Sequence, residues 1–239
     1  MKKNQIKTAF SRAAETYDLA AEVQTLSSTH LCEMIEVPFS PQKILDIGCG
    51  TGITSVEMMK KYPQAHYTLC DISEKMIDEA KRKIKKDAQF IVCDAEKYDF
   101  PEKYDLGISN LALQWFESPH DFIEKILGHC RFFAFSTLIE GSFCDWRKNL
   151  EDCGTFSGAY PSSEDIIRAC RRCGVLKRHE IKKYDLQFES MFESAKYFKK
   201  LGATANFTNK NGTLSALRRH NQNITLNYEV FFALLMAPS

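Results

Sequence analysis

A glycine-rich loop is the first feature of this sequence whose residue types and spacing suggest ligand chemistry. The stretch LDIGCGTG places Gly48, Gly50 and Gly52 directly after an apolar run that we expect to form a strand. Glycine permits a tight turn and lets the backbone approach a ligand closely. The helix expected to follow would present free N–H groups and positive potential to an anion. We therefore expect this loop to bind a small molecule.

Two common nucleotide motifs do not fit this loop. In the dinucleotide pattern G-x-G-x-x-G the last position would be Ile53 or Ser55, depending on which glycine begins the count. The phosphate-binding P-loop pattern also fails, because no Lys-Ser or Lys-Thr pair follows the glycines. The loop therefore matches neither of these nucleotide-binding classes.

Three aspartates are expected at the ends of successive strands. Asp71 lies 19 residues after Gly52, where a carboxylate can accept hydrogen bonds from both hydroxyls of a ribose. Asp94 ends the next strand, where it could meet an adenine amino group, and Asp46 belongs to the strand before the glycines. Because the carboxyl ends of strands in an open α/β sheet form one ligand crevice, the three side chains predict a ligand that contains adenosine.

The elements that must position these residues alternate between short apolar strands and helices. We expect strands at 43–48, 66–71, 89–94, 104–110, 131–138, 183–188 and 227–237, and helices at 53–62, 73–86, about 119–128, 162–174 and 193–203. Ser73 is the expected N-cap of the second of these helices. This alternation predicts a mostly parallel sheet with helices on both faces.

Residues 1–40, and about 141–160 with 190–225, stand outside this alternation, so we expect them to cover the ligand edge of the sheet. The stretch FSRAAETYDLAAEVQ at 10–24 is amphipathic. As one helix it would place Phe10, Ala13, Ala14 and Tyr17 on a single face, at helical spacing. We expect that helix to act as a lid that excludes water from the ligand.

Composition excludes several classes of protein. The chain has 239 residues and a formal net charge of +1, without the basic excess that is typical of nucleic-acid binders. It begins without an apolar signal segment, and its longest apolar run, VFFALLMA at 230–237, is too short to cross a membrane. Nine scattered cysteines favour reduced thiols in the cytoplasm. The six histidines show no metal-ligand spacing, so we expect no metal.

The motifs LDIGCGTG, LCDIS, VCDAEKYDF and SNLALQW together resemble the class I S-adenosylmethionine-dependent methyltransferases over residues 43–138. The resemblance implies a Rossmann-like α/β fold with a seven-stranded, mostly parallel sheet. It implies S-adenosyl-L-methionine as cofactor and S-adenosyl-L-homocysteine as product. The cofactor-binding residues that it implies are Asp46, Gly48, Cys49, Gly50, Gly52, Asp71, Ile72, Met76, Asp94, Ala95 and Asn110.

A narrower resemblance covers nearly the whole chain. The stretches FSRAAETYDLAAEVQ, SNLALQW, STLIEGSF and KKLGATA look like those of the biotin-pathway malonyl-[acyl-carrier-protein] O-methyltransferases. This implies a helical lid at 1–40 and a methyltransferase domain at 41–239 with substrate-cap insertions. It also implies methyl transfer to the free carboxylate of a malonyl group on acyl carrier protein. The resemblance leaves the oligomeric state open and implies neither a nucleic acid nor a membrane as partner.

A malonyl carboxyl group is ionised at neutral pH, so this reaction requires no general base. We expect catalysis from alignment and from desolvation of the carboxylate. The candidates for positioning the substrate are Tyr17, Gln114, Trp115 and Arg147. For Arg147 a surface position on a helix competes with a carboxylate fork, and for Trp115 ordinary core packing competes with a place beside the substrate.

Two further functions stay open on the sequence. One is a class I methyltransferase that acts on another small carboxylic acid or small molecule. The other is an inactive scaffold that binds S-adenosylmethionine.

Basic residues cluster late in the chain. We expect at least one of these clusters to flank the substrate entrance and to steer an acidic carrier protein. The two clusters are Arg168, Arg171, Arg172, Lys177 and Arg178, and then Lys196, Lys199 and Lys200.

Overall fold

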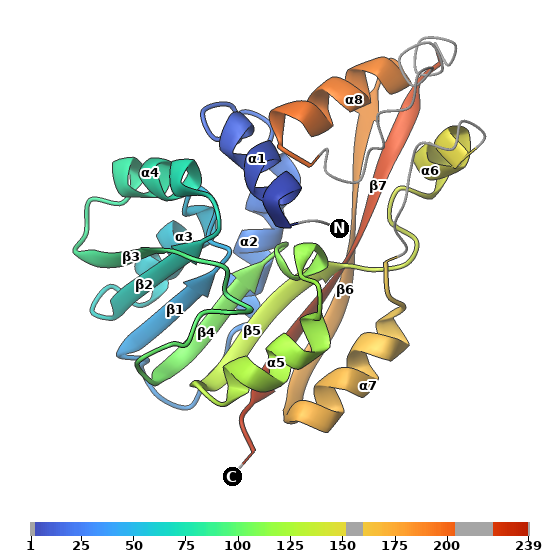
Figure 1. The fold of residues 1–239 in the computed structure, drawn as a ribbon. Helices are drawn as coiled ribbons and strands as arrows, with labels where there is room; N and C mark the ends of the chain where they lie inside the picture. Colours follow the sequence, from blue (N-terminus) through green and yellow to red (C-terminus); the bar gives the residue numbers. More distant parts are fainter. Residues whose placement is uncertain (1–2, 152–159, 204–221, 239) are drawn as a thin grey trace.

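The computed structural model describes residues 3–151, 160–203 and 222–238. In this part of the chain seven strands form one sheet in the order β3-β2-β1-β4-β5-β7-β6 (Figure 1). Strand β7 runs antiparallel to both of its neighbours, and the other pairs are parallel. The strands are β1 Lys43–Ile47, β2 His66–Asp71, β3 Ala88–Val92, β4 Tyr104–Asn110, β5 Cys130–Leu138, β6 Val175–Phe188 and β7 Ile224–Met236. The predicted α/β class and sheet are confirmed.

The central strands are apolar on both faces because each face is covered by helices. Along β5, Phe132 and Ala134 belong to one core, while Phe133 and Phe135 belong to the other. This is the two-residue alternation of side chains in a strand. Continuous apolar runs in the sequence therefore fill two hydrophobic layers at once.

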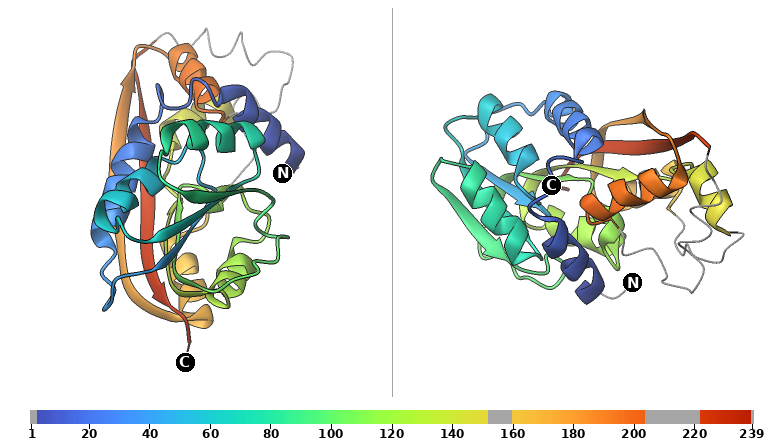
Figure 2. Two further views of the ribbon diagram at one scale, coloured as in Figure 1. Left: turned by 90° about the vertical axis from the view of Figure 1, so that its left-hand side faces the viewer. Right: turned by 90° about the horizontal axis from the view of Figure 1, so that it is seen from above.

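Helices form a layer on each side of the sheet (Figure 2). One core includes residues of α2 Glu22–Met34, α3 Ile53–Lys61 and α4 Glu74–Lys83. The other includes residues of α5 Pro119–Leu127 and α7 Ser163–Cys173. The hydroxyl of Ser73 accepts a hydrogen bond from Met76 N at the start of α4, which confirms the predicted N-cap.

Four further elements lie toward the carboxyl ends of β1, β4 and β5, at the upper edge of the sheet in Figure 1. They are α1 Lys3–Ala13, the 3₁₀ turn η1 Leu113–Trp115, α6 Cys144–Glu151 and α8 Met191–Lys200. Helices α6 and α8 come from the two segments that we expected to cover this edge. The remainder of those segments, 152–159 and 204–221, lies outside the described residues.

The expectation of one helix over 10–24 is wrong. Helix α1 ends at Ala13, and turns over residues 14–21 lead into α2, which packs on the face of the sheet instead of over its edge. Tertiary contacts outweigh the high helix propensity of this segment. Asp18 accepts a hydrogen bond from Thr51 (2.6 Å) and pairs with Lys83 (2.6 Å), which holds the turn away from a straight helical path.

Strand β6 begins eight residues before the expected 183–188 strand, at Val175. The segment between is rich in charged residues, so no apolar alternation marks it as a strand. It pairs along its length with β7 and forms an edge of the sheet, where one side of the strand faces solvent. Pairing with a neighbour, rather than local pattern, therefore sets the length of this strand.

Candidate active site

The glycine loop joins β1 to α3 and has the backbone conformation that only glycine adopts freely. Gly48 and Gly50 have φ values of 66° and 54°. A Cβ on Gly48 would lie 2.6 Å from the Cβ of Ala112, so side chains are also excluded there by packing. A Cβ on Gly50 would meet nothing within 4 Å, because this residue faces a cleft. Gly52 caps α3 and lies outside the cleft lining.

Asp71 closes the loop from the end of β2. Its two carboxylate oxygens accept hydrogen bonds from Gly50 N (3.0 Å) and from Ser73 N (2.8 Å). Burial raises the pKa of this carboxyl to about 6, although these backbone hydrogen bonds oppose the rise. Each oxygen has a second lone pair, so Asp71 can still accept hydrogen bonds from a ligand in the cleft.

Asp46 and Asp94 take different places from Asp71. Asp46 is buried inside β1, outside the cleft lining, and accepts a hydrogen bond from Ser55 Oγ of α3 (2.6 Å). Burial raises its pKa to about 7. Asp94 lies just after β3 and does line the cleft, but it pairs with Lys3 of α1 (2.9 Å). The structure therefore separates an aspartate that supports the loop from two that face the ligand space.

The cleft encloses about 860 Å³ of space that no atom fills, part of it open to solvent. Of the eleven cofactor residues that the resemblance implies, Asp46 and Gly52 lie outside its lining. The other nine, which the structure brings together here, are Gly48, Cys49, Gly50, Asp71, Ile72, Met76, Asp94, Ala95 and Asn110.

Helix α1 crosses one side of the cleft and is held there by polar contacts. Lys3 also pairs with Glu96 and lies over the ring of Phe116. Ser11 shares a hydrogen bond with Ser73 at the start of α4 (2.8 Å). Phe10 meets the indole of Trp115 edge to face, with ring centroids 5.4 Å apart. The N-terminal segment therefore forms a wall of the cleft.

A second pocket of about 550 Å³ adjoins the first. Five residues line both pockets and so form the wall between them: Phe10, Tyr17, Gln24, Leu111 and Trp115. The second pocket is largely aromatic, and its remaining described lining consists of Gln114, Leu138, Phe143, Trp146, Tyr160, Phe198, Leu201, Ala203 and Tyr228.

Backbone strain concentrates at the second pocket. Within the described residues, Leu111 (φ 49°) and Phe143 (φ 59°) are the non-glycine residues with positive φ, and both line it. Leu111 N donates to the carbonyl and the hydroxyl of Ser136, and Phe143 N donates to Asn227 O. Such conformations persist only where neighbouring contacts hold them, and they occur often at ligand sites.

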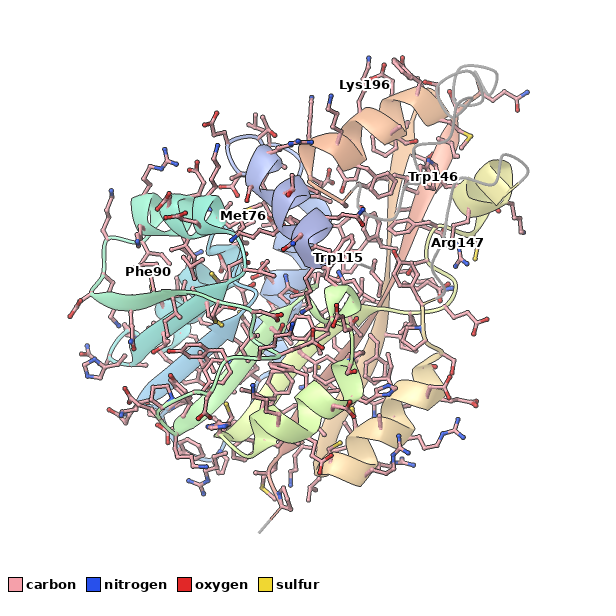
Figure 3. All side chains as sticks on the ribbon, viewed as in Figure 1. Met76, Phe90, Trp115, Trp146, Arg147 and Lys196 are labelled. Carbon is pink, nitrogen blue, oxygen red and sulfur yellow. The ribbon has the colours of Figure 1, made fainter. Side chains whose placement is uncertain are left out.

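Three of the four substrate-positioning candidates line the pockets. Tyr17 and Trp115 border both, and Gln114 borders the second. Arg147 lies half-buried on α6 and is absent from both linings. Figure 3 shows Arg147 and Met76 on opposite sides of α1. Met76 lines the cleft that contains the glycine loop.

Several residues of the site have no signal in the sequence. Lys3 stands in a run of polar residues, and nothing in that run marks it as a partner of Asp94. Gln24 and Tyr228 belong to elements whose faces become known only once the fold is known. Among the described residues no group of three His, Cys, Asp or Glu side chains could hold a metal ion. None of the described helices has the length and apolarity to cross a bilayer.

Comparison with known proteins agrees with this geometry. A family model described as a methyltransferase domain matches residues 44–131. The fold is similar to that of an N-methyltransferase from Bradyrhizobium japonicum, solved with S-adenosyl-L-homocysteine. The TM-score is 0.53 at 13% identity, over 89% of this chain and 86% of that one. The strand order, the glycine loop and this match define a class I methyltransferase whose cofactor is S-adenosyl-L-methionine.

Two relatives define the family more closely. A protein from Neorickettsia risticii is 32% identical over 200 residues, which cover 81% of this chain and 80% of that protein. A protein from Priestia megaterium is 33% identical over 231 residues, with 84% and 82% covered. Both bear the name malonyl-[acyl-carrier protein] O-methyltransferase, and the chain belongs to that family.

Proposed function

We propose that this chain transfers a methyl group from S-adenosyl-L-methionine to the free carboxylate of a malonyl group carried by acyl carrier protein. The observation that carries this proposal is the pair of adjoining pockets with one shared wall. One pocket has the glycine loop and Asp71, and the other is an aromatic chamber of a size for a short acyl group. Two relatives at 32% and 33% identity are named for this reaction.

The first pocket fits the proposed cofactor on its own geometry. The open space at Gly50 lets a ligand approach the loop backbone, and Asp71 offers acceptors for ribose hydroxyls. The start of α3 offers positive potential to an amino-acid carboxylate. S-adenosyl-L-methionine supplies, when bound, a methyl group that its positive sulfur makes electrophilic.

The protein's own part in the reaction is to bind, orient and desolvate. A malonyl carboxyl group has a pKa of about 4 or below, so it reaches the site as a carboxylate and needs no base. Aromatic walls remove water from that carboxylate, which makes its oxygen more reactive. Tyr17 and Trp115 belong to the shared wall, where they would align the acceptor with the cofactor. We retain Gln114 and Arg147 as further positioning candidates.

Methylation would convert the charged malonyl carboxylate into a neutral ester. The ester product has lost the negative charge of malonate, so fatty-acid elongation could accept it as a primer for pimeloyl synthesis and biotin. We place this reaction in the cytoplasm, where the free thiols of the chain would stay reduced.

We further propose that the carrier protein docks over α8. Phe198 of α8 and Leu201 just after it line the second pocket, whereas Lys196, Lys199 and Lys200 are exposed. Figure 3 shows Lys196 on the outer side of this helix. Carrier proteins of fatty-acid synthesis are acidic, so this basic face would attract them beside the acyl-binding pocket.

The other basic cluster is in the wrong place for this role. Arg171 and Arg172 lie in the last turn of α7, and the next residues pack against Met236. Met236 pairs with Phe132 near the start of β5, whereas the pockets lie at the far end of that strand. Six residue steps along β5 separate Phe132 from Leu138 of the pocket lining, or about 20 Å.

The test is transfer of radiolabelled methyl from S-adenosyl-L-methionine to four kinds of acceptor: malonyl-acyl carrier protein, malonyl-coenzyme A, acetyl-acyl carrier protein and other small carboxylic acids. We expect base-labile methyl ester on the malonyl acceptors and none on the acetyl carrier, which has no free carboxylate. Transfer to other small carboxylic acids but to no malonyl thioester would contradict the proposal. Cofactor binding without transfer to any acceptor would leave a scaffold role.

A further inference from the structure

The polar side chains that line the second pocket are unusual for a pocket proposed to bind an anion. Within its described lining there is no lysine, arginine or histidine. Its polar side chains are all neutral amides, phenols and indoles. Among the described lining residues only neutral donors can hold a carboxylate, and the hydrogen bonds of the structure show which of them are available.

Two of the polar side chains are already engaged by the protein. Gln114 donates its amide hydrogen to Leu111 O (2.6 Å) and accepts a hydrogen bond from Thr137 Oγ1 (3.3 Å). Trp146 donates its indole hydrogen to Ser194 Oγ (2.8 Å). These contacts hold the walls of the pocket in shape. They use the only donor of the Trp146 indole and one of the two amide hydrogens of Gln114.

Gln24, in contrast, has a buried side-chain atom without a hydrogen-bond partner among the described residues. Its side chain is in the wall between the two pockets, only 8% of the residue is exposed, and its amide oxygen Oε1 is buried without a hydrogen-bond partner in the described part of the chain. Burial of an amide without a partner is costly, and native structures seldom leave one so. A half turn of the amide exchanges its oxygen and its NH₂ group, so at this place Gln24 can present a donor to a ligand in the pocket.

The Tyr197–Tyr228 pair offers a second donor. The two hydroxyl oxygens lie 3.0 Å apart, and either one can donate to the other. Two phenols carry two hydroxyl hydrogens, and the contact between them uses one, so one remains for a ligand. Tyr228 is buried and lines the second pocket. Burial first, and then the neighbouring phenol of Tyr197, raise the pKa of Tyr228 well above its usual value, so the group stays a donor.

We propose that Gln24 and Tyr228 form the binding subsite for the carboxylate of the acceptor, through an amide N–H and a phenolic O–H. This inference rests on the proposed function and adds the residues that recognise its substrate class. Neutral donors orient a carboxylate without cancelling its charge, so the free oxygen keeps its reactivity toward the methyl group. Methylation removes the charge and weakens these hydrogen bonds, which favours release of the ester.

The experiment measures binding rather than turnover, with the protein saturated by S-adenosyl-L-homocysteine. Calorimetry gives the affinity for malonyl-coenzyme A and for its methyl ester, in the unaltered protein and in Tyr228→Phe, Gln24→Leu and Gln24→Glu. Tyr184→Phe is the matched control, because Tyr184 pairs with Tyr228 across β6 and β7 but lies outside the pocket lining.

We expect Tyr228→Phe and Gln24→Leu each to weaken malonyl binding roughly tenfold or more, and ester binding less than about twofold. Gln24→Glu keeps the shape of the side chain but repels the anion, so its loss should be the largest. Tyr184→Phe should bind both compounds as the unaltered protein does. Unchanged affinity for S-adenosyl-L-homocysteine in Tyr228→Phe shows that the fold is intact.

Two results would overturn the subsite and are distinguishable from each other. If the unaltered protein binds malonyl-coenzyme A but the Gln24 and Tyr228 variants lose both compounds equally, or neither, these residues do not read the carboxylate. A selective loss in Arg147→Leu with no such loss in those variants would assign the role to a cation instead. Failure of the unaltered protein to bind any malonyl thioester would contradict the proposed function as well.

Discussion

The two pockets of this protein are built in different ways. The cofactor cleft uses backbone conformation and strand ends: a loop fixed by Gly48, and a carboxylate on Asp71 that Gly50 N of the loop and Ser73 N hold in place. The second pocket uses side chains, mostly aromatic, from segments that span Phe10 to Tyr228 in the sequence. A site built from backbone geometry is rigid and suits one cofactor. A site built from side chains of many elements can change by substitution and so suit different acceptors.

This contrast predicts that variants in the two pockets have separable effects. The largest effect is expected from Asp71→Ala in the cofactor cleft. Two ribose hydroxyls would lose a charged acceptor, and hydrogen bonds to charged groups contribute about 1.5–3 kcal/mol each. We expect cofactor affinity to fall by roughly a hundredfold or more in calorimetry. The exposed Asp78→Ala on α4 is the control, and equal affinities in the two variants would remove Asp71 from the site.

Tyr17 borders both pockets, so it tests where the boundary between them lies. Burial, and then the nearby Asp71, raise the pKa of Tyr17, which keeps its hydroxyl as a donor. We expect Tyr17→Phe to lower kcat/KM for the malonyl carrier roughly tenfold or more and to change cofactor affinity less than about twofold. Steady-state kinetics beside calorimetry will show this. Equal activity in both proteins would reduce Tyr17 to a packing role.

The raised pKa of Asp71 predicts a pH dependence that belongs to the cofactor cleft. Its pKa of about 6 lies within reach of neutral pH, and the ionised form is the better acceptor. Cofactor affinity should therefore rise as the pH goes from 5 to 7, by up to about tenfold, and then level off. Calorimetry across this range should find a flat profile in Asp71→Asn. A flat profile in the unaltered protein would contradict the prediction.

The same shift has the opposite sign for the stability of the ligand-free protein. Burial raises the pKa of Asp71 in the folded chain above its unfolded value, so the folded state binds the proton more tightly. Stability from this group is therefore present below the unfolded pKa, near 4, and is lost as the pH rises through about 6. The pH range that favours cofactor binding is thus the one in which Asp71 no longer adds to the stability of the ligand-free protein.

The smallest effect is expected at the rim of the second pocket. Replacing Lys196, Lys199 and Lys200 with glutamate should raise the apparent KM for malonyl-acyl carrier protein roughly threefold to tenfold and reduce its salt dependence. Lys196 already pairs with Glu193 (2.8 Å), so its share should be the least. Malonyl-coenzyme A should respond little. Arg171→Glu with Arg172→Glu is the control at the far end of the sheet, and an equal effect there would exclude α8 as the docking face.

Much of the cofactor cleft was predictable because its signals are local. Three glycines after an apolar run, with a carboxylate at the end of the next strand, suffice to predict the loop, the crevice and an adenosine ligand. Strands and helices alternate clearly from residue 43, so the place of Asp71 beside Gly50 follows from the fold class. Asp46 is an exception. Its position near a strand end predicts a place beside the ligand, but its side chain accepts a hydrogen bond from Ser55 instead.

The second pocket and the N-terminal turn depended on tertiary structure. An amphipathic pattern over 10–24 predicts one helix, but contacts of Asp18 with Thr51 and Lys83 end the helical path and bring Tyr17 to the shared wall. The sequence also contains two clusters of basic residues, but it does not indicate at which end of the sheet each cluster lies. Gln24 and Tyr228 lie more than 200 residues apart, and no local pattern brings such residues together. Only packing of the whole chain decides that they share a pocket, because their burial depends on partners from other elements.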